Sequence, residues 1–285
     1  MILLHNRCKH IDSSNDLNFT AISVPELTMK PDGDERNYAT WKMLGWCGPI
    51  FLAIFTGFWG VLAGNMPPAG ADLTPLQIAA HYSDNRMALI VGMSICMVGS
   101  AFYFPWGIAI AQVIRRVDGR DSILAQLESM GATITVAFPI ISCGIWLTAA
   151  LEVAILPPEL IHMLYYLGWM IIDLAYMVTT FQIVAVSIAF LRDKRDNPLV
   201  PAWVCWWGYF TAATFFPVSL IPFFKTGPFA FHGLFNFWIA FFAWYVWCGS
   251  LSAYVIRAVS RLQREDLASS AEKGAIARGL AHAAA

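Results

Sequence analysis

The chain has 285 residues, of which 58% are hydrophobic and 13% are charged, and its formal net charge is −1. A soluble domain carries roughly 25% charged residues, so this composition excludes an ordinary soluble protein and indicates an integral membrane protein. The near-zero net charge provides no excess of basic residues for binding nucleic acid. The six cysteines include no C-x-x-C pair, and we interpret them as small hydrophobic residues rather than redox or metal sites.

The two ends of the chain are more polar than its middle. We expect residues 1–42 to form a polar N-terminal extension, residues 43–257 a single transmembrane domain, and residues 258–285 an Ala-rich tail. No basic stretch followed by a sustained apolar core marks a cleaved signal at the start. The last segment suits either a surface helix or an irregular tail, and we favour the tail.

Six apolar segments are each long enough to cross a bilayer. A hydrocarbon core of about 30 Å needs about 20 apolar residues, and the backbone in lipid must satisfy its own hydrogen bonds as a helix. The sequence therefore predicts an all-α, polytopic membrane bundle with six transmembrane helices, kinked by the prolines at positions 105, 139, 217 and 222. The six segments are 43–64, 87–114, 132–156, 160–191, 199–224 and 229–256.

The connections between these segments alternate in charge. "RRVDGRD" and "RDKRDNP" join segments two to three and four to five, and "RAVSRLQR" follows the sixth, whereas the other loops hold only Arg86 and Lys225. By the positive-inside rule, both termini would be cytoplasmic. We expect a multi-pass protein of the bacterial inner (plasma) membrane.

The first loop on the predicted outer side carries a helix-start signal. Thr74 is followed by Pro75 and Gln77, the pattern of a capping box with proline at the first helical position. We therefore expect a short helix on the outer face, which would place His81 above the mouth of the bundle.

The fourth segment carries a polar and aromatic stripe with an acid at its centre. Asp173 lies thirteen residues after Leu160, about 20 Å along a helix. A charged carboxylate there costs at least about 2.5 to 3.5 kcal/mol, so we expect Asp173 to face the interior, to be neutral, and to exchange a proton. Spacings of three and four put these residues on one helical face: His162, Tyr166, Trp169, Asp173, Tyr176 and Thr180.

Other polar residues are expected near the outer ends of the third and sixth segments. Glu152 ends one of them, and His232 and Asn236 share a helical face at the start of the other. Together they predict an outward-facing cavity for a ligand. Its predicted ligand-binding residues are Asp173, Glu152, His232, Asn236, Trp169, Tyr166, His162 and Tyr176.

Each of these residues also has a structural interpretation. Asp173 could form a buried hydrogen bond to a neighbouring helix, and Glu152 and the histidines could be interfacial anchors. Deep tryptophans are more often packed core than ligand contacts.

The sequence lacks the usual motifs of cofactor chemistry. No H-x-x-x-H, H-E-x-x-H, phosphate-binding loop or G-x-S-x-G is present. A b-type haem between His162 and His232 is a less favoured alternative. We expect no metal and no cofactor.

The stretch "PFFKTGPFAFHGLFNFW", with "IAAHY" of the first outer loop and the acid of the fourth segment, resembles a group of bacterial six-span membrane proteins of unassigned function. The resemblance covers residues from about 45 to 256. It implies the topology and carries no mechanism.

Three functions fit these features. The favoured one is a binder or permease for a small, mostly apolar or aromatic molecule, with proton coupling through Asp173. The second is an intramembrane enzyme, such as an isomerase that moves protons with Asp173, Glu152 and His232 on a lipophilic substrate. The third is a membrane subunit of a larger complex, or a homo-oligomer. The expected partners are thus membrane lipid and a small lipophilic molecule.

Overall fold

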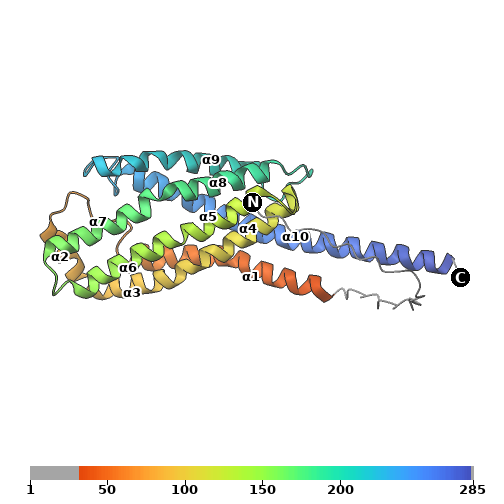
Figure 1. Cartoon of the computed structure of the whole chain (residues 1–285), viewed down its shortest axis with the longest axis horizontal. Helices are drawn as coiled ribbons and strands as arrows, with labels where there is room; N and C mark the ends of the chain where they lie inside the picture. Colours follow the sequence, from red (N-terminus) through yellow and green to blue (C-terminus); the bar gives the residue numbers. More distant parts are fainter. Residues whose placement is uncertain (1–31, 284–285) are drawn as a thin grey trace, which may run out of the picture.

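The architecture is an elongated bundle of helices (Figure 1), and a computed structural model describes residues 32–283. Six of the described helical segments are long and apolar enough to cross a membrane, which confirms the predicted fold class. Their bounds are Asn37–Leu62, Arg86–Asp118, Ile123–Glu152, Pro158–Leu191, Ala202–Phe223 and Leu234–Leu280.

Every one of these six spans is built from more than one helical piece. The first is α1 (Asp32–Ile54) with the π-helix η1 (Phe55–Leu62), and the second is α3 (Arg86–Gly99), the 3₁₀ turn η2 (Ser100–Phe102) and α4 (Tyr103–Asp118). The third is α5 (Ile123–Thr135) with α6 (Ala137–Glu152), and the fourth is α7 (Pro158–Leu174) with α8 (Tyr176–Leu191). The fifth is α9 (Ala202–Thr214) with the 3₁₀ segment η3 (Phe216–Phe223), and the sixth is the π-helix η4 (Leu234–Ile239) with α10 (Ala240–Ala283).

Proline causes three of these interruptions. The ring of a proline inside a helix clashes with the carbonyl four residues earlier. In the second, third and fifth spans, that carbonyl lies at or next to the interruption, so the predicted kinks at Pro105, Pro139 and Pro217 are confirmed. The carbonyls concerned belong to Ala101, Thr135 and Ala213.

One end of the bundle, which we call the basic end, carries the ion pairs of the described residues. Arg116 of α4 donates to both carboxylate oxygens of Asp266 on α10, at 2.8 and 2.6 Å, and Tyr38 of α1 donates to the same carboxylate. Arg192 pairs with Asp118 at 2.9 Å. These contacts join the first, second, fourth and sixth spans where they leave the apolar layer.

The opposite end, which we call the α2 end, is covered by the short helix α2 (Pro75–Asp84) (Figure 1). The capping box between Thr74 and Gln77 is present, as predicted. Arg86 closes this end further, because its guanidinium donates to the carbonyls of Ala150 and Leu151 in the last turn of α6, at 3.1 and 2.9 Å. Those carbonyls have no partner within the helix.

The structure differs from the sequence predictions at three segment boundaries. The third span begins at Ile123 rather than at residue 132. The sequence predicts the later start because Glu128 interrupts the apolar pattern, but in the structure Glu128 is helical and buried. The predicted irregular tail from residue 258 is instead a continuation of α10 to Ala283. The predicted extension 1–42 overlaps α1, which begins at Asp32, and its first 31 residues lie outside the described part of the chain.

Close packing between α6 and α7 depends on Gly168. A Cβ atom there would lie 2.3 Å from Nε1 of Trp146, the atom that donates to the carbonyl of Tyr165 at 3.1 Å. We predict that Gly168→Ala lowers the free energy of unfolding in detergent by about 1 to 3 kcal/mol, the usual cost of overpacking. Gly144→Ala is the matched control, since its Cβ would meet its nearest neighbour at 3.9 Å. Equal stability of the two variants would contradict this packing.

Candidate functional site

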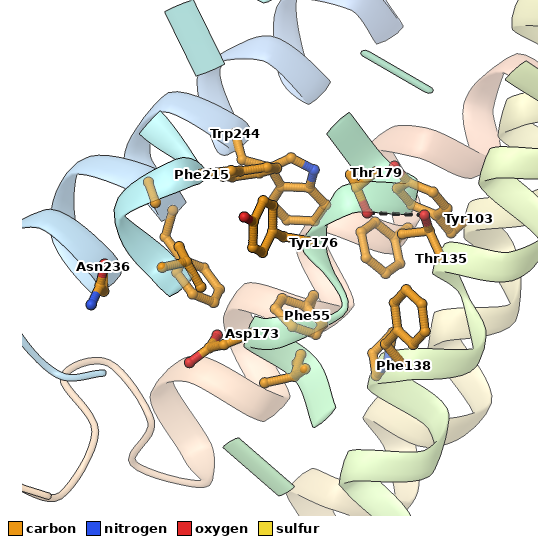
Figure 2. A pocket seen from close by; sticks show the side chains of 16 residues that line it. Phe55, Tyr103, Thr135, Phe138, Asp173, Tyr176, Thr179, Phe215, Asn236 and Trp244 are labelled. Carbon is orange, nitrogen blue, oxygen red and sulfur yellow. Dashed lines mark hydrogen bonds between the residues drawn. The ribbon is translucent and has the colours of Figure 1, made fainter. Parts of the chain in front are cut away.

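The interior of the bundle contains a pocket to which all six spans contribute. Its volume is about 100 Å³, which is room for several water molecules or a small ligand. Aromatic and aliphatic side chains make most of its wall, and a few polar groups interrupt them (Figure 2). Lining residues from the six spans in order include Phe55, Tyr103, Thr135, Asp173, Phe215 and Trp244.

The pocket lies where the helices are interrupted. A lining residue falls within or directly beside the interruption of every span. An interrupted helix leaves backbone groups outside the regular ladder, and π-helical turns are frequent at functional sites. In the order of the spans, these residues are Phe55, Tyr103, Thr135, Asp173 with Tyr176, Phe215, and Asn236.

Asp173 and Asn236 form the polar wall of the pocket nearer the α2 end. Asp173 is the next-to-last residue of α7 and is 9% exposed, so the prediction that it faces the interior is confirmed. No described residue forms a hydrogen bond or ion pair with its carboxyl group. An unpaired acid in an apolar interior is costly unless it is neutral or has a ligand or water as partner.

The Asn236 amide has one end bound and one end free. Its Nδ2 donates to the backbone carbonyls of Phe229 and Ala230, so the opposite end of the amide must be the oxygen. That Oδ1 is buried and has no hydrogen-bond partner in the part of the chain that the structure describes. This wall of the pocket therefore offers two acceptors, the Asn236 carbonyl and the Asp173 carboxyl, and the carboxyl also donates when it is protonated.

The opposite wall carries three hydroxyl groups (Figure 2). Thr135 of α5 and Thr179 of α8 are hydrogen-bonded to each other at 3.0 Å, and Tyr103 of α4 lies beside them. Aromatic rings, including those of Phe55 and Trp244, lie between the two polar walls. The pocket is therefore amphipathic, with an aromatic middle and a polar wall on each side.

Tyr176 also lines the pocket, and its hydroxyl is 2.6 Å from the Ser219 hydroxyl of η3. Asp173, Tyr176 and Asn236 are thus the sequence-predicted site residues that the structure brings together around one cavity.

Three other predicted site residues lie around the loop before α2. His232 accepts a hydrogen bond from the backbone N–H of Ala71 through Nδ1, at 3.0 Å. Tyr166 donates to the carbonyl of Ala71, and His162 packs against the Tyr166 ring at 4.8 Å. Their contacts hold this loop against the bundle, and none of the three lines the pocket.

On α2 itself, burial lowers the pKa of His81, and the negative charge of Asp84 opposes this shift.

Trp169 and Glu152 also lie outside the pocket wall. Trp169 is fully buried, stacked on Phe231 at 5.0 Å and packed beside Trp146 at 5.2 Å, so it belongs to the aromatic core. Glu152 ends α6 at the α2 end of the bundle. Within residues 32–283, no three His, Cys, Asp or Glu side chains form a cluster suited to a metal.

Three buried residues that are linked by hydrogen bonds are not among the predicted site residues. Tyr103 donates to Oε1 of Gln182 at 3.1 Å, and Nε2 of Gln182 donates to Oε1 of Glu128 at 3.0 Å. Glu128 and Gln182 are fully buried. The sequence contains a signal for this pair, since Gln182 lies inside the predicted fourth segment and Glu128 lies just before the third, and both need partners in lipid.

No family model, curated protein or solved structure matches this chain. The function is therefore inferred from the pocket itself.

The unpaired state of Asp173 predicts an unusual response to mutation. Asp173→Asn should leave the thermal stability unchanged or raise it, because no hydrogen bond is lost. Thr179→Val, the isosteric control, removes the bond to Thr135 and should cost about 0.5 to 1.5 kcal/mol. Thermal unfolding of both purified variants is the measurement. A loss of stability in Asp173→Asn larger than that in Thr179→Val would show that Asp173 is structural.

Proposed function

We propose that this protein binds a small aromatic molecule in the pocket and carries it across the membrane, with a proton exchanged at Asp173. The observation that supports this most is the pocket's position: it lies within the bundle, at the interruptions of all six spans, and contains an acid with no partner among residues 32–283. Transporters place their sites at broken helices near mid-membrane for the same reason, since irregular backbone is tolerated where it lines a cavity.

The chemistry of the walls narrows the ligand class. Rings such as Phe55 and Trp244 suit an aromatic body, which gains both apolar burial and ring contacts. Asp173 and the free Oδ1 of Asn236 accept hydrogen bonds, so the ligand should carry a donor group such as an amide, amidine or amine. The cavity volume of about 100 Å³ limits the ligand to one small ring, because an engineered apolar cavity of about 150 Å³ binds benzene.

The enzyme alternative receives less support from the geometry. It needs Asp173, Glu152 and His232 around one substrate, whereas the pocket wall includes Asp173 alone of the three. His232 is engaged with Ala71 in the loop before α2.

Binding can be tested with probes that differ in one group. We expect radiolabelled benzamidine and benzamide, which have N–H donors, to bind the purified protein, and toluene, which has none, to bind at least tenfold more weakly. Asp173→Asn should weaken benzamidine binding at least tenfold, about 1.4 kcal/mol, because the amidinium loses its charged acceptor. Glu152→Gln, outside the pocket, is the matched control. Equal affinities for the three probes, or full affinity in Asp173→Asn, would reject this site.

Transport is a separate measurement. Proteoliposomes preloaded at low pH and diluted into higher pH should accumulate benzamidine by exchange for protons, above the level of protein-free vesicles. Vesicles with Asp173→Asn should fall to that background, because the asparagine amide holds no exchangeable acid proton. Uptake that persists in this variant would reject proton exchange at Asp173 as part of transport, and the binding result would still stand.

A further inference from the structure

A second acid lies inside the bundle, outside the pocket and beyond its polar wall nearer the basic end. Glu128 of α5 is fully buried, its Oε2 has no hydrogen-bond partner, and it belongs to no ion pair of the described residues. It lies six residues into α5, after Ser122, about 9 Å along the helix. A carboxylate that far from water, with no positive neighbour, has a strong tendency to hold a proton.

The surrounding helices are packed so that this acid and Gln182 fit between them. A Cβ atom on Gly107 of α4 would lie 2.2 Å from the Ala132 side chain and 3.3 Å from Oε1 of Glu128. A Cβ atom on Gly131 of α5 would lie 2.8 Å from Cβ of Gln182. Two glycines thus bring α4, α5 and α8 close enough to enclose the pair and to keep other side chains out.

Gln182 and Tyr103 connect Glu128 to the pocket. Tyr103 lines the pocket and donates to Gln182, and Gln182 donates to Glu128. Both bonds run in one direction, from the pocket hydroxyl toward the acid. Gln182 lies nine residues after Asp173 on the fourth span, about 14 Å along a helix. The two acids therefore lie at different depths, with the pocket between them.

We propose that Glu128 is a proton-binding site separate from Asp173, and that Gln182 and Tyr103 transmit its protonation to the pocket wall. The observed bonds require Oε1 of Glu128 to be an acceptor. A proton on that oxygen makes it a donor, which favours the flipped amide of Gln182, with its oxygen toward Glu128 and its NH₂ toward Tyr103. The Tyr103 hydroxyl then accepts from Gln182, and its own proton is released from the bond and is available to the pocket.

A proton suits this site better than a metal cation. A metal needs several oxygen ligands, whereas Glu128 has the Gln182 amide beside it, and the described residues include no cluster of three His, Cys, Asp or Glu side chains. The other titratable groups close enough to interact with its charge are Tyr103 on α4 and Cys248 on α10, and α8 contributes the neutral Gln182. The inference concerns this line of groups and does not require the proposed ligand.

Infrared difference spectroscopy of the full-length protein in lipid vesicles tests the assignment. Stepping the pH should reveal a carboxylic C=O band that shifts when the protein is labelled with ¹³C-carboxyl glutamate, and that disappears in Glu128→Gln. Asp173→Asn should remove a different band, which the glutamate label does not shift. Glu159→Gln, at the exposed start of α7, should leave both bands in place. The absence of any label-sensitive carboxylic band in the native chain would overturn the proposal, and this readout does not depend on the folding of a variant.

The link through Tyr103 has its own readout. Tyr103→Phe removes the hydroxyl bound to Gln182 and should shift the frequency of the Glu128 band, whereas Tyr209→Phe on α9 should not. An unchanged band in Tyr103→Phe would show that Glu128 is isolated from the pocket and would reject the transmission step. A failure of benzamidine to bind would reject the proposed ligand class and would leave the infrared result unaffected.

Discussion

The absence of water from the hydrocarbon layer is the constraint on which this structure depends. Backbone N–H and C=O groups in that layer must find partners within the chain, so the apolar segments are helical. The same constraint sends polar side chains inward. Ser187 and Ser252, for example, are buried and donate to carbonyls one turn earlier in their own helices, at 2.8 and 2.7 Å. The Asp173 carboxyl, Oδ1 of Asn236 and Oε2 of Glu128 differ from these serines, because none of them forms a hydrogen bond with a described residue.

The pocket and the interrupted helices have a common physical basis. A regular helix presents a continuous surface of side chains and uses all its internal carbonyls, whereas an interruption changes the direction of the chain and frees backbone groups. Here each helix changes its winding at the pocket, by a proline in three spans and by π-helical turns in the first and the sixth. Aromatic side chains beside these changes, such as those of Tyr103 and Tyr176, line the same pocket (Figure 2).

The sequence predicted the parts of this arrangement that have local causes. Length and hydropathy identified six spans, proline identified three interruptions, and the depth of Asp173 indicated that it faces the interior. The capping box at Thr74 also follows from adjacent residues. The interruption at Ala175 and the two π-helical turns contain no proline, so the sequence pattern did not indicate where they lie.

The site itself was predictable in part. Asp173, Tyr176 and Asn236 line one cavity, but periodicity within one helix could not show that His232 and Tyr166 turn toward the loop before α2 instead. A charge at the edge of an apolar segment is typical of the end of a span, so the sequence alone places Glu128 in a loop. Its partner Gln182 lies 54 positions later in the sequence, a separation that no local pattern reveals.

Helix α10 has a mechanical consequence. Its first turns carry Ala240 and Trp244 of the pocket wall, and it then continues without a break through 44 residues, past the Arg116–Asp266 pair and out of the bundle (Figure 1). At 1.5 Å per residue the whole helix is about 66 Å long. Val255, Val259 and Leu262 are fully buried along it, so α10 is anchored in the bundle as far as the ion pair, and the segment from Asp266 to Ala283 projects about 26 Å from a fixed support.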